Sequence, residues 1–178
     1  MPLYAPVGTS PVSQGFLGAF AWEAAGYVGT GKPRRGARHR FSMQSEYRAH
    51  VHLALDYVCP IGTPVRAFKA GTIAGQGWDS SGAYLVYLRV RRGKKYDVTA
   101  LYYHLKAGSF RFGLGDRVKK GQAVALSGNT GLSTGPHLHT ELIRSRRGAG
   151  LSEIYREGVR FDPKPFIAGT ARLRDIAP

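Results

Sequence analysis

The chain has 178 residues, which is enough for one domain with a core of its own. Its 26 lysine and arginine residues against 11 acidic residues give a net charge of +15, which predicts attraction to a polyanion such as nucleic acid, an anionic membrane or bacterial wall polymers. No run of about 18 apolar residues exists, and this excludes a transmembrane helix. The single cysteine, Cys59, excludes an internal disulfide and a cysteine-based zinc site.

The N-terminal part of the chain carries few structural signals. Its start, "MPLYAPVGTSPVSQGFLGAF", has neither the basic stretch nor the continuous apolar stretch of a secretory signal peptide, and we expect none. Residues 22–49 contain "GYVGTGKPRRGARHR" and have no clear periodicity. They predict a long basic loop, of a kind that is often functional in a compact domain.

Strand patterns dominate the middle of the chain. Residues 83–92, "AYLVYLRVRR", and 96–105, "YDVTALYYHL", alternate in character and flank "GKK", which predicts a long hairpin. Residues 63–78 and 115–131 share a loose pattern of valine, a basic stretch, glycine and small residues, which indicates a degenerate repeat of short strands. The predicted class is therefore mainly β, with an antiparallel, sandwich-like core.

Helical patterns are scarce. The segment "SEIYRE", residues 152–157, predicts one or two helical turns, with Ser152 able to cap them.

Two histidines in "STGPHLHTE", residues 133–141, point to chemistry. Side chains alternate along a strand, so His137 and His139 are expected on one face and Leu138 on the other. Two imidazoles on one face are half of a metal site.

The other half is expected in "HVHLALDY", residues 50–57, where a strand would carry His50, His52 and Asp56 on one face. A zinc enzyme typically uses three protein ligands and leaves the fourth position to water. His52, Asp56 and one histidine of the later strand make such a set. His50 shares the face of His52, so an exchange of ligands stays open, although a place at the rim of the site is favoured.

Further candidates lie near these strands. His104 ends the second strand of the predicted hairpin, from where it could take a proton from a zinc-bound water or donate a hydrogen bond to an oxyanion. Tyr47, Tyr102 and Tyr103 could also hydrogen-bond a reacting group, but packing is the favoured role for each. Cys59 is expected to be a small buried apolar residue.

Several motifs together resemble one known family, the lysostaphin and LytM type of zinc endopeptidases that cut peptidoglycan peptides. The resemblance is dense over residues 50–143, and it is carried by "HLALD", "PIGTPVRAFKAGTI", "LYYHL", "GDRVKKGQAVALSGNTG" and "STGPHLHTE". In addition, "FDPKPFI" is similar to the closing segment of the family and "PVSQGFLG" to its opening strand.

The resemblance implies a role for each site residue. It makes His52, Asp56 and His139 the ligands of one zinc ion per chain, and His104 and His137 a catalytic pair that is not bound to zinc. Ala54 and Thr140 stand where the family usually has glycine and phenylalanine. Thr140 is expected to face away from the site, so this change bears on packing more than on chemistry.

The resemblance also implies the organisation of the chain. We expect a single LytM-type endopeptidase domain of the duplicated hybrid type over residues 1–178, with its core at about 50–143. A basic loop insertion at about 22–49 and a second insertion at 145–159 depart from the compact pattern.

Two other functions are alternatives to a zinc endopeptidase that hydrolyses peptidoglycan stems or cross-bridges. A non-catalytic LytM-like module that binds wall or regulates a partner would have lost some of the five site residues, which are all present. A basic nucleic-acid-binding β domain would leave those five residues unexplained, so no nucleic-acid partner is expected. The bond that is cut stays open.

The predicted place of action is the bacterial cell wall. The expected partners are peptidoglycan and, through the basic surface, anionic wall polymers; we expect a monomer. Without a signal peptide, the chain would be a phage lysin released at lysis, a virion-associated enzyme, or a trimmed secreted protein.

Overall fold

The computed structural model describes residues 6–7, 10, 12–14 and 52–176. The predicted basic loop at about 22–49, Tyr47 and His50 lie outside these residues.

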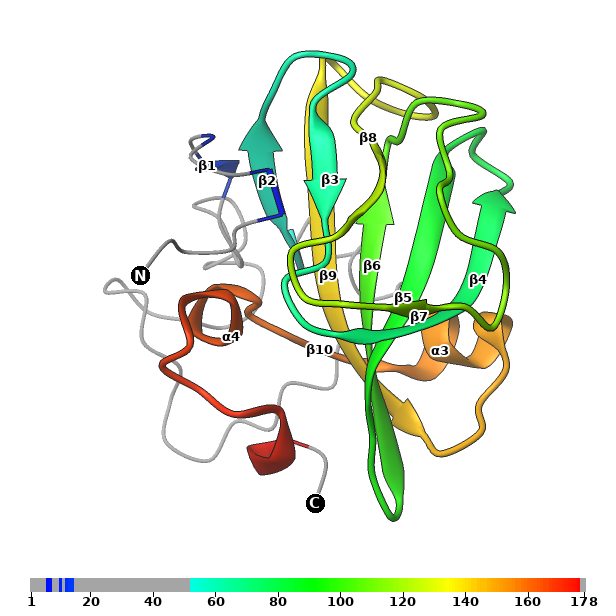
Figure 1. Cartoon of the computed structure of the whole chain (residues 1–178), viewed down its shortest axis with the longest axis vertical. Coiled ribbons are helices and arrows are strands. Elements are labelled where there is room, and N and C mark those ends of the chain that lie inside the picture. The colour runs from blue at the N-terminus through cyan, green and yellow to red at the C-terminus, as the bar shows by residue number, and fades with distance from the viewer. Residues whose placement is uncertain (1–5, 8–9, 11, 15–51, 177–178) are drawn as a thin grey trace.

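Antiparallel β-structure forms the body of the molecule, which confirms the predicted class (Figure 1). In the described residues, eight strands make one sheet in the order β1-β2-β9-β6-β5-β4-β7, with β10 beside β9. A second, two-stranded sheet is formed by β3 and β8. The strands are β1 (Val12–Gln14), β2 (Leu55–Val58), β3 (Pro64–Arg66), β4 (Gly71–Trp78), β5 (Tyr84–Arg92), β6 (Tyr96–Tyr103), β7 (Arg117–Val118), β8 (Ala123–Leu126), β9 (His137–Arg146) and β10 (Val159–Phe161). The helices are α3 (Leu151–Glu157), α4 (Lys164–Ala168) and the 3-10 turn η1 (Leu173–Asp175).

The predicted hairpin forms the centre of the large sheet. Strands β5 and β6 pair through a turn at 93–95, in which the amide of Gly93 donates to the carbonyl of Tyr96. All residues of β6 after Tyr96 are buried, because β5 and β9 flank this strand and other elements cover both of its faces. The turn at 93–95 and His104, which follows Tyr103, lie at opposite ends of β6.

The two predicted repeat units pair with each other. The first supplies β3 and β4, and the second supplies β7 and β8. Strand β3 pairs with β8, and β4 pairs with β7. This reciprocal pairing is what a duplicated unit related by an approximate two-fold axis would give.

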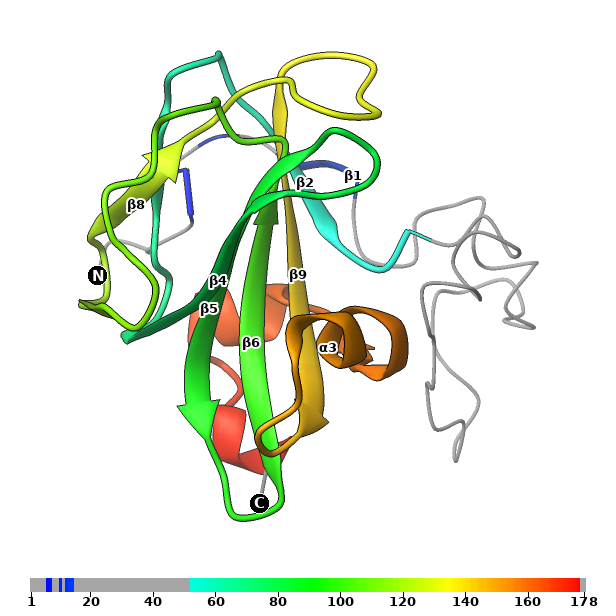
Figure 2. The ribbon, with the colours of Figure 1, turned by 90° about the vertical axis from the view of Figure 1, so that its right-hand side faces the viewer.

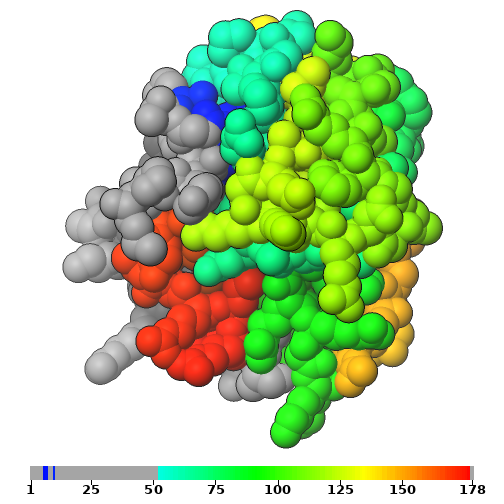
Figure 3. Space-filling view, in the orientation of Figure 1, coloured from blue at the N-terminus to red at the C-terminus, as the bar shows by residue number. Residues whose placement is uncertain are grey.

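The large sheet separates two clusters of apolar side chains. Alternate residues of β9 fall on opposite faces: Leu138 and Leu142 enter one cluster, with β3, β8 and α4, whereas Ile143 enters the other, with Ile154 of α3. Figure 2 shows β8 and α3 on opposite sides of the sheet. The space-filling view shows the β3 and β7–β8 segments on the face turned to the viewer, with the C-terminal segment below them (Figure 3). His139, by its place in β9, lies on the α3 side.

Two local predictions were wrong. Strand β2 begins only at Leu55, so His52 precedes it and the chain bends at Ala54, whereas an unbroken strand was expected over 50–57. Helix α3 is confirmed, but it begins at Leu151 and is capped by Gly150 with extended backbone angles, so Ser152 lies inside its first turn. None of the helices in the described part of the chain has the length and apolar character needed to cross a bilayer.

Candidate metal centre

Three neighbouring strands bring the predicted site residues together. Asp56 of β2 lies opposite His139 of β9, and His139 lies opposite Tyr103 of β6. His52 joins them from the bend before β2, and His104 follows the last residue of β6. Paired residues of neighbouring strands project to the same face of a sheet, so the strand pairing itself gathers these side chains.

His52, Asp56 and His139 form a compact group of three possible ligands, whose ligating atoms all lie within 4.8 Å of one another. The Nε2 atom of His52 is 3.3 Å from Nδ1 of His139 and 3.2 Å from Oδ1 of Asp56. The Nδ1 atom of His139 is 3.0 Å from the same carboxylate oxygen. Two imidazole nitrogens and one carboxylate oxygen that converge on one point fit a zinc ion with an open fourth position.

The charges within this group favour a cation. Burial alone would raise the pKa of Asp56, but hydrogen bonds with His139 and His52 lower it well below its usual range, so this carboxylate is ionised. Burial would lower the pKa of His139, but Asp56 and Glu141 raise it to about 10. A metal ion must therefore displace a proton from His139 when it binds.

The position of His104 is fixed by an unusual backbone conformation and by a hydrogen bond to a neighbouring loop. It has a φ of 58°, a left-handed conformation that is uncommon for residues other than glycine, and such strain often occurs at functional positions. Its Nδ1 atom donates a hydrogen bond to the carbonyl of Thr130 at 2.7 Å, which leaves Nε2 as the acceptor of the neutral ring. Burial is the main reason why the pKa of His104 is lowered to about 4, so the ring is neutral near pH 7.

A glycine lets this loop approach. A Cβ atom on Gly128 would lie 2.6 Å from backbone atoms of Leu105 and Lys106 and 2.8 Å from the carbonyl oxygen of His104. Only glycine therefore allows the loop of Thr130 to pack directly on the backbone that carries His104.

His137 completes the group of four imidazoles. Its Nδ1 atom donates to the carbonyl of Gly135 at 2.8 Å, and its Nε2 atom lies 3.9 Å from Oδ2 of Asp56. Its ring centroid is 4.5 Å from that of His104. Both rings thus donate Nδ1–H to a backbone carbonyl and keep Nε2 for other contacts.

The remaining candidates from the sequence have packing roles. Tyr102 is fully buried, and its hydroxyl accepts a hydrogen bond from the amide of Phe68 at 3.4 Å. Tyr103 packs edge-to-face against His139, with ring centroids 5.5 Å apart. Cys59 is buried, as expected, and burial raises the pKa of its thiol. Thr140 is fully buried, on the sheet face opposite His139, as strand parity predicted.

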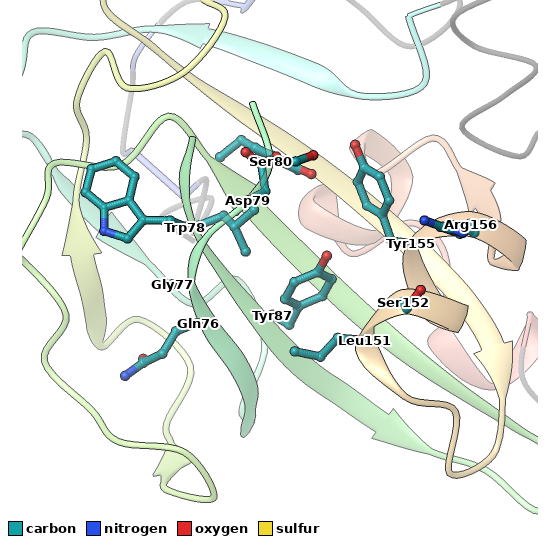
Figure 4. Close-up of a pocket in the computed structure, with 12 residues that line it drawn as sticks. Gln76, Gly77, Trp78, Asp79, Ser80, Tyr87, Leu151, Ser152, Tyr155 and Arg156 are labelled. Carbon is teal, nitrogen blue, oxygen red and sulfur yellow. The ribbon is translucent and has the colours of Figure 1, made fainter. Parts of the chain in front are cut away.

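A pocket of about 320 Å³ has Tyr103, the neighbour of His139, in its lining. Its walls come from β4 and β5 on one side and from α3 on the other, with Tyr103 in its lining (Figure 4). Figure 4 shows the rings of Tyr87 and Tyr155 and the side chain of Leu151 directed into this space, whereas Trp78 points away from it. Because Tyr103 also contacts His139, the pocket and the metal centre share a wall.

Two residues behind His139 were not predicted from the sequence. The Nε2 atom of His139 is 3.3 Å from Oε1 of Glu141, and the other oxygen of Glu141 accepts a hydrogen bond from Nε of Arg160 at 2.7 Å. The period of two in "HLHTE" places Glu141 on the face of His139, so this partner was within reach of the pattern. Nothing near Arg160 in the sequence indicated that it would reach the site.

The sequence of this chain is similar to those of known endopeptidases. A search of the curated proteins finds glycyl-glycine endopeptidase ALE-1 of Staphylococcus capitis, 32% identical over 65% of this chain and 29% of that protein. It also finds peptidoglycan DD-endopeptidase ShyC of Vibrio cholerae, 36% identical over 52% of this chain and 20% of that protein. The matched region thus spans less than a third of either relative.

A solved structure and a family model also match this chain. A mutant of the catalytic domain of the prophage-encoded M23 protein EnpA from Enterococcus faecalis superposes with a TM-score of 0.53 at 26% identity, over 90% of this chain and 95% of that one. The model of peptidase family M23 matches residues 50–152, which is more than half of the chain. The chain therefore belongs to peptidase family M23.

Proposed function

We propose that this protein is a zinc-dependent endopeptidase that hydrolyses peptide bonds in the stems or cross-bridges of bacterial peptidoglycan. The observation that carries the proposal is the convergence of His52, Asp56 and His139, with two further imidazoles beside them. The names of the relatives ALE-1 and ShyC support the class of reaction and the substrate. A non-catalytic wall-binding module has no need for this complete set of five residues.

His52, Asp56 and His139 hold the metal, through two nitrogen atoms and one carboxylate oxygen. When bound, zinc supplies a Lewis acid for the scissile carbonyl and lowers the pKa of a water ligand towards about 7. The two remaining imidazoles are those of His104 and His137. They would accept the proton of the attacking water and stabilise the negative charge that develops on the carbonyl oxygen.

We assign His104 as the proton acceptor of the pair. Its ring is neutral at pH 7, and its Nδ1 hydrogen is committed to the carbonyl of Thr130, so Nε2 can accept a proton from the attacking water. His137 directs its Nε2 atom to the same region as the carboxylate of Asp56. With hydrogen on both of its ring nitrogens, it could keep its bond to the carbonyl of Gly135 and donate from Nε2, and we assign it as the donor to the carbonyl oxygen in the transition state.

The basic surface is proposed to hold the protein on anionic wall polymers. In the described residues, the tip of the β5–β6 hairpin carries a hollow lined by Arg91, Arg92, Lys94 and Arg147. The tip lies at the opposite end of β6 from His104, about 25 Å away by the rise of an extended strand. An anionic polymer bound there would leave the metal centre open to a peptide.

We also propose that the protein comes from a phage and that it is a monomer. The solved structure of prophage-encoded EnpA, which resembles this chain over most of its length, supports the first point.

Digestion of defined cell walls tests the proposed function. Purified protein loaded with one equivalent of zinc should release peptide-containing fragments from walls whose cross-bridges are known, and mass spectrometry of the new termini identifies the bond. A chelator should abolish the release, and zinc should restore it. Walls left intact by the zinc-loaded protein, whatever their cross-bridge, would contradict the proposal.

A further inference from the structure

A buried ion pair lies directly behind the candidate metal centre. Glu141 and Arg160 are each 1% exposed, and Nε of Arg160 donates to Oε2 of Glu141 at 2.7 Å. A guanidinium is always charged, and a contact as short as this one is typical of a charge-assisted hydrogen bond to an ionised carboxylate. An ionised carboxylate at this depth depends on its partner, because a buried charge without compensation is strongly destabilising.

The other oxygen of Glu141 determines which ring nitrogen of His139 carries the hydrogen. An ionised carboxylate only accepts hydrogen bonds, so the contact of 3.3 Å between Oε1 of Glu141 and Nε2 of His139 places a hydrogen on Nε2. In the neutral ring, Nδ1 then carries the lone pair, and this atom faces Asp56 and His52. Partners of this kind fix both the tautomer and the orientation of a histidine ligand.

The guanidinium of Arg160 also holds helix α3. Its NH2 group donates to the carbonyl of Tyr155 at 2.8 Å, and its NH1 group donates to the carbonyl of Gly158 at 3.1 Å. These carbonyls lie at the C-terminal end of α3, where backbone oxygens lack partners within the helix. All three nitrogens of one planar group are thus used, and a lysine ammonium could not reproduce this arrangement.

We propose that Arg160 is a positioning residue: through Glu141 it holds His139 with Nδ1 directed at the metal, and through the backbone of α3 it joins the pocket wall to the same ligand. The proposal rests on the assignment of His139 as a ligand in the proposed function. It extends that assignment to a residue that touches neither metal nor substrate. Tyr155, which lines the pocket, and His139 are then held by a single side chain.

Zinc affinity, measured by competition with a chromogenic chelator, tests the proposal without any assay of activity. Arg160→Met keeps an unbranched apolar stem but removes the charge and the donors. Loss of such an outer partner typically weakens metal binding by about 10–100-fold, and we expect a loss of this size. In the zinc-loaded variant labelled with ¹⁵N-histidine, the Nε2–H signal of His139 should also broaden or be lost.

The exposed ion pair between Arg146 and Glu153 provides a matched control. It links β9 to the same helix, with distances of 3.1 and 3.2 Å, but it does not touch the metal centre. Arg146→Met should therefore leave the zinc affinity within about twofold of that of the unchanged protein, because exposed pairs contribute little. An equal loss of affinity in Arg146→Met would mean that any loosening of α3 suffices, and would overturn the specific role of Arg160.

A second variant keeps the test valid if Arg160→Met does not fold. Glu141→Gln combined with Arg160→Met removes both charges together, which leaves no uncompensated buried charge. The same loss of zinc affinity is expected, because the ionised acceptor of the His139 Nε2 hydrogen is gone. Folded variants that bind zinc as tightly as the unchanged protein would refute the proposal, whereas an unchanged protein that binds no zinc would refute the proposed function itself.

Discussion

Replacement of His104 by alanine should separate catalysis from metal binding. The ring of His104 donates to the carbonyl of Thr130 and lies next to the ring of His137, and its centroid is 5.9 Å from that of His139. It therefore contributes no atom to the group formed by His52, Asp56 and His139. Removal of a proton acceptor typically costs about 10²–10⁴-fold in rate, which corresponds to about 3–5 kcal/mol of transition-state stabilisation.

The assay compares His104→Ala with His139→Ala on a soluble peptide substrate, with bound zinc measured in the same samples. His104→Ala should keep one equivalent of zinc and lose kcat/KM by about 10²–10⁴-fold. His139→Ala should lose both zinc and activity, because only two ligands remain. Loss of zinc from His104→Ala, as from His139→Ala, would refute the assignment of His104 as a catalytic residue that does not bind the metal, and so would a kcat/KM within tenfold of that of the unchanged protein.

Three further predictions concern pH, packing and charge. Because the pKa of His104 is lowered to about 4, mainly by burial, its ring should stay neutral with the hydrogen on Nδ1 from pH 8 down to pH 5; a titration midpoint near 6.5 in ¹⁵N NMR spectra would contradict this. Gly128→Ala places a Cβ 2.6 Å from backbone atoms next to His104, so kcat/KM should fall by about 100-fold while zinc affinity is kept; normal activity would show that the loop can move without cost. Binding to purified walls should weaken between 0.1 M and 1 M salt, because the screening length falls from about 10 Å to about 3 Å. The double variant Arg92→Ser/Lys94→Ser should bind walls more weakly still, while its hydrolysis of a soluble peptide should be unchanged. Co-sedimentation with walls that is the same at both salt concentrations and in the variant would exclude electrostatic attachment.

Strand periodicity predicted much of the site. The alternation in "HLHTE" correctly placed His137 and His139 on one face and Leu138 in the core, because the period of two is a property of any extended strand. The same argument failed for His52, since the chain bends at Ala54 before β2 begins. His52 nevertheless reaches Asp56, at 3.2 Å, through the bend and not through strand parity.

Other features needed the three-dimensional structure. Arg160 lies 19 residues after Glu141, and in a chain with a net charge of +15 an arginine is expected at the surface. Its burial follows from the pairing of β10 with β9, which the sequence did not reveal. The cap of α3 was misplaced by two residues because Gly150 supplies extended backbone angles without any side-chain bond.

Anomalous diffraction at the zinc edge, from crystals of the zinc-loaded protein, tests the central claim most directly. We expect one peak per chain, within bonding distance of Nε2 of His52, the carboxylate of Asp56 and Nδ1 of His139, with the rings of His104 and His137 near it but not bound. The absence of a peak at these three side chains, or a peak bonded to His104 or His137, would contradict the account.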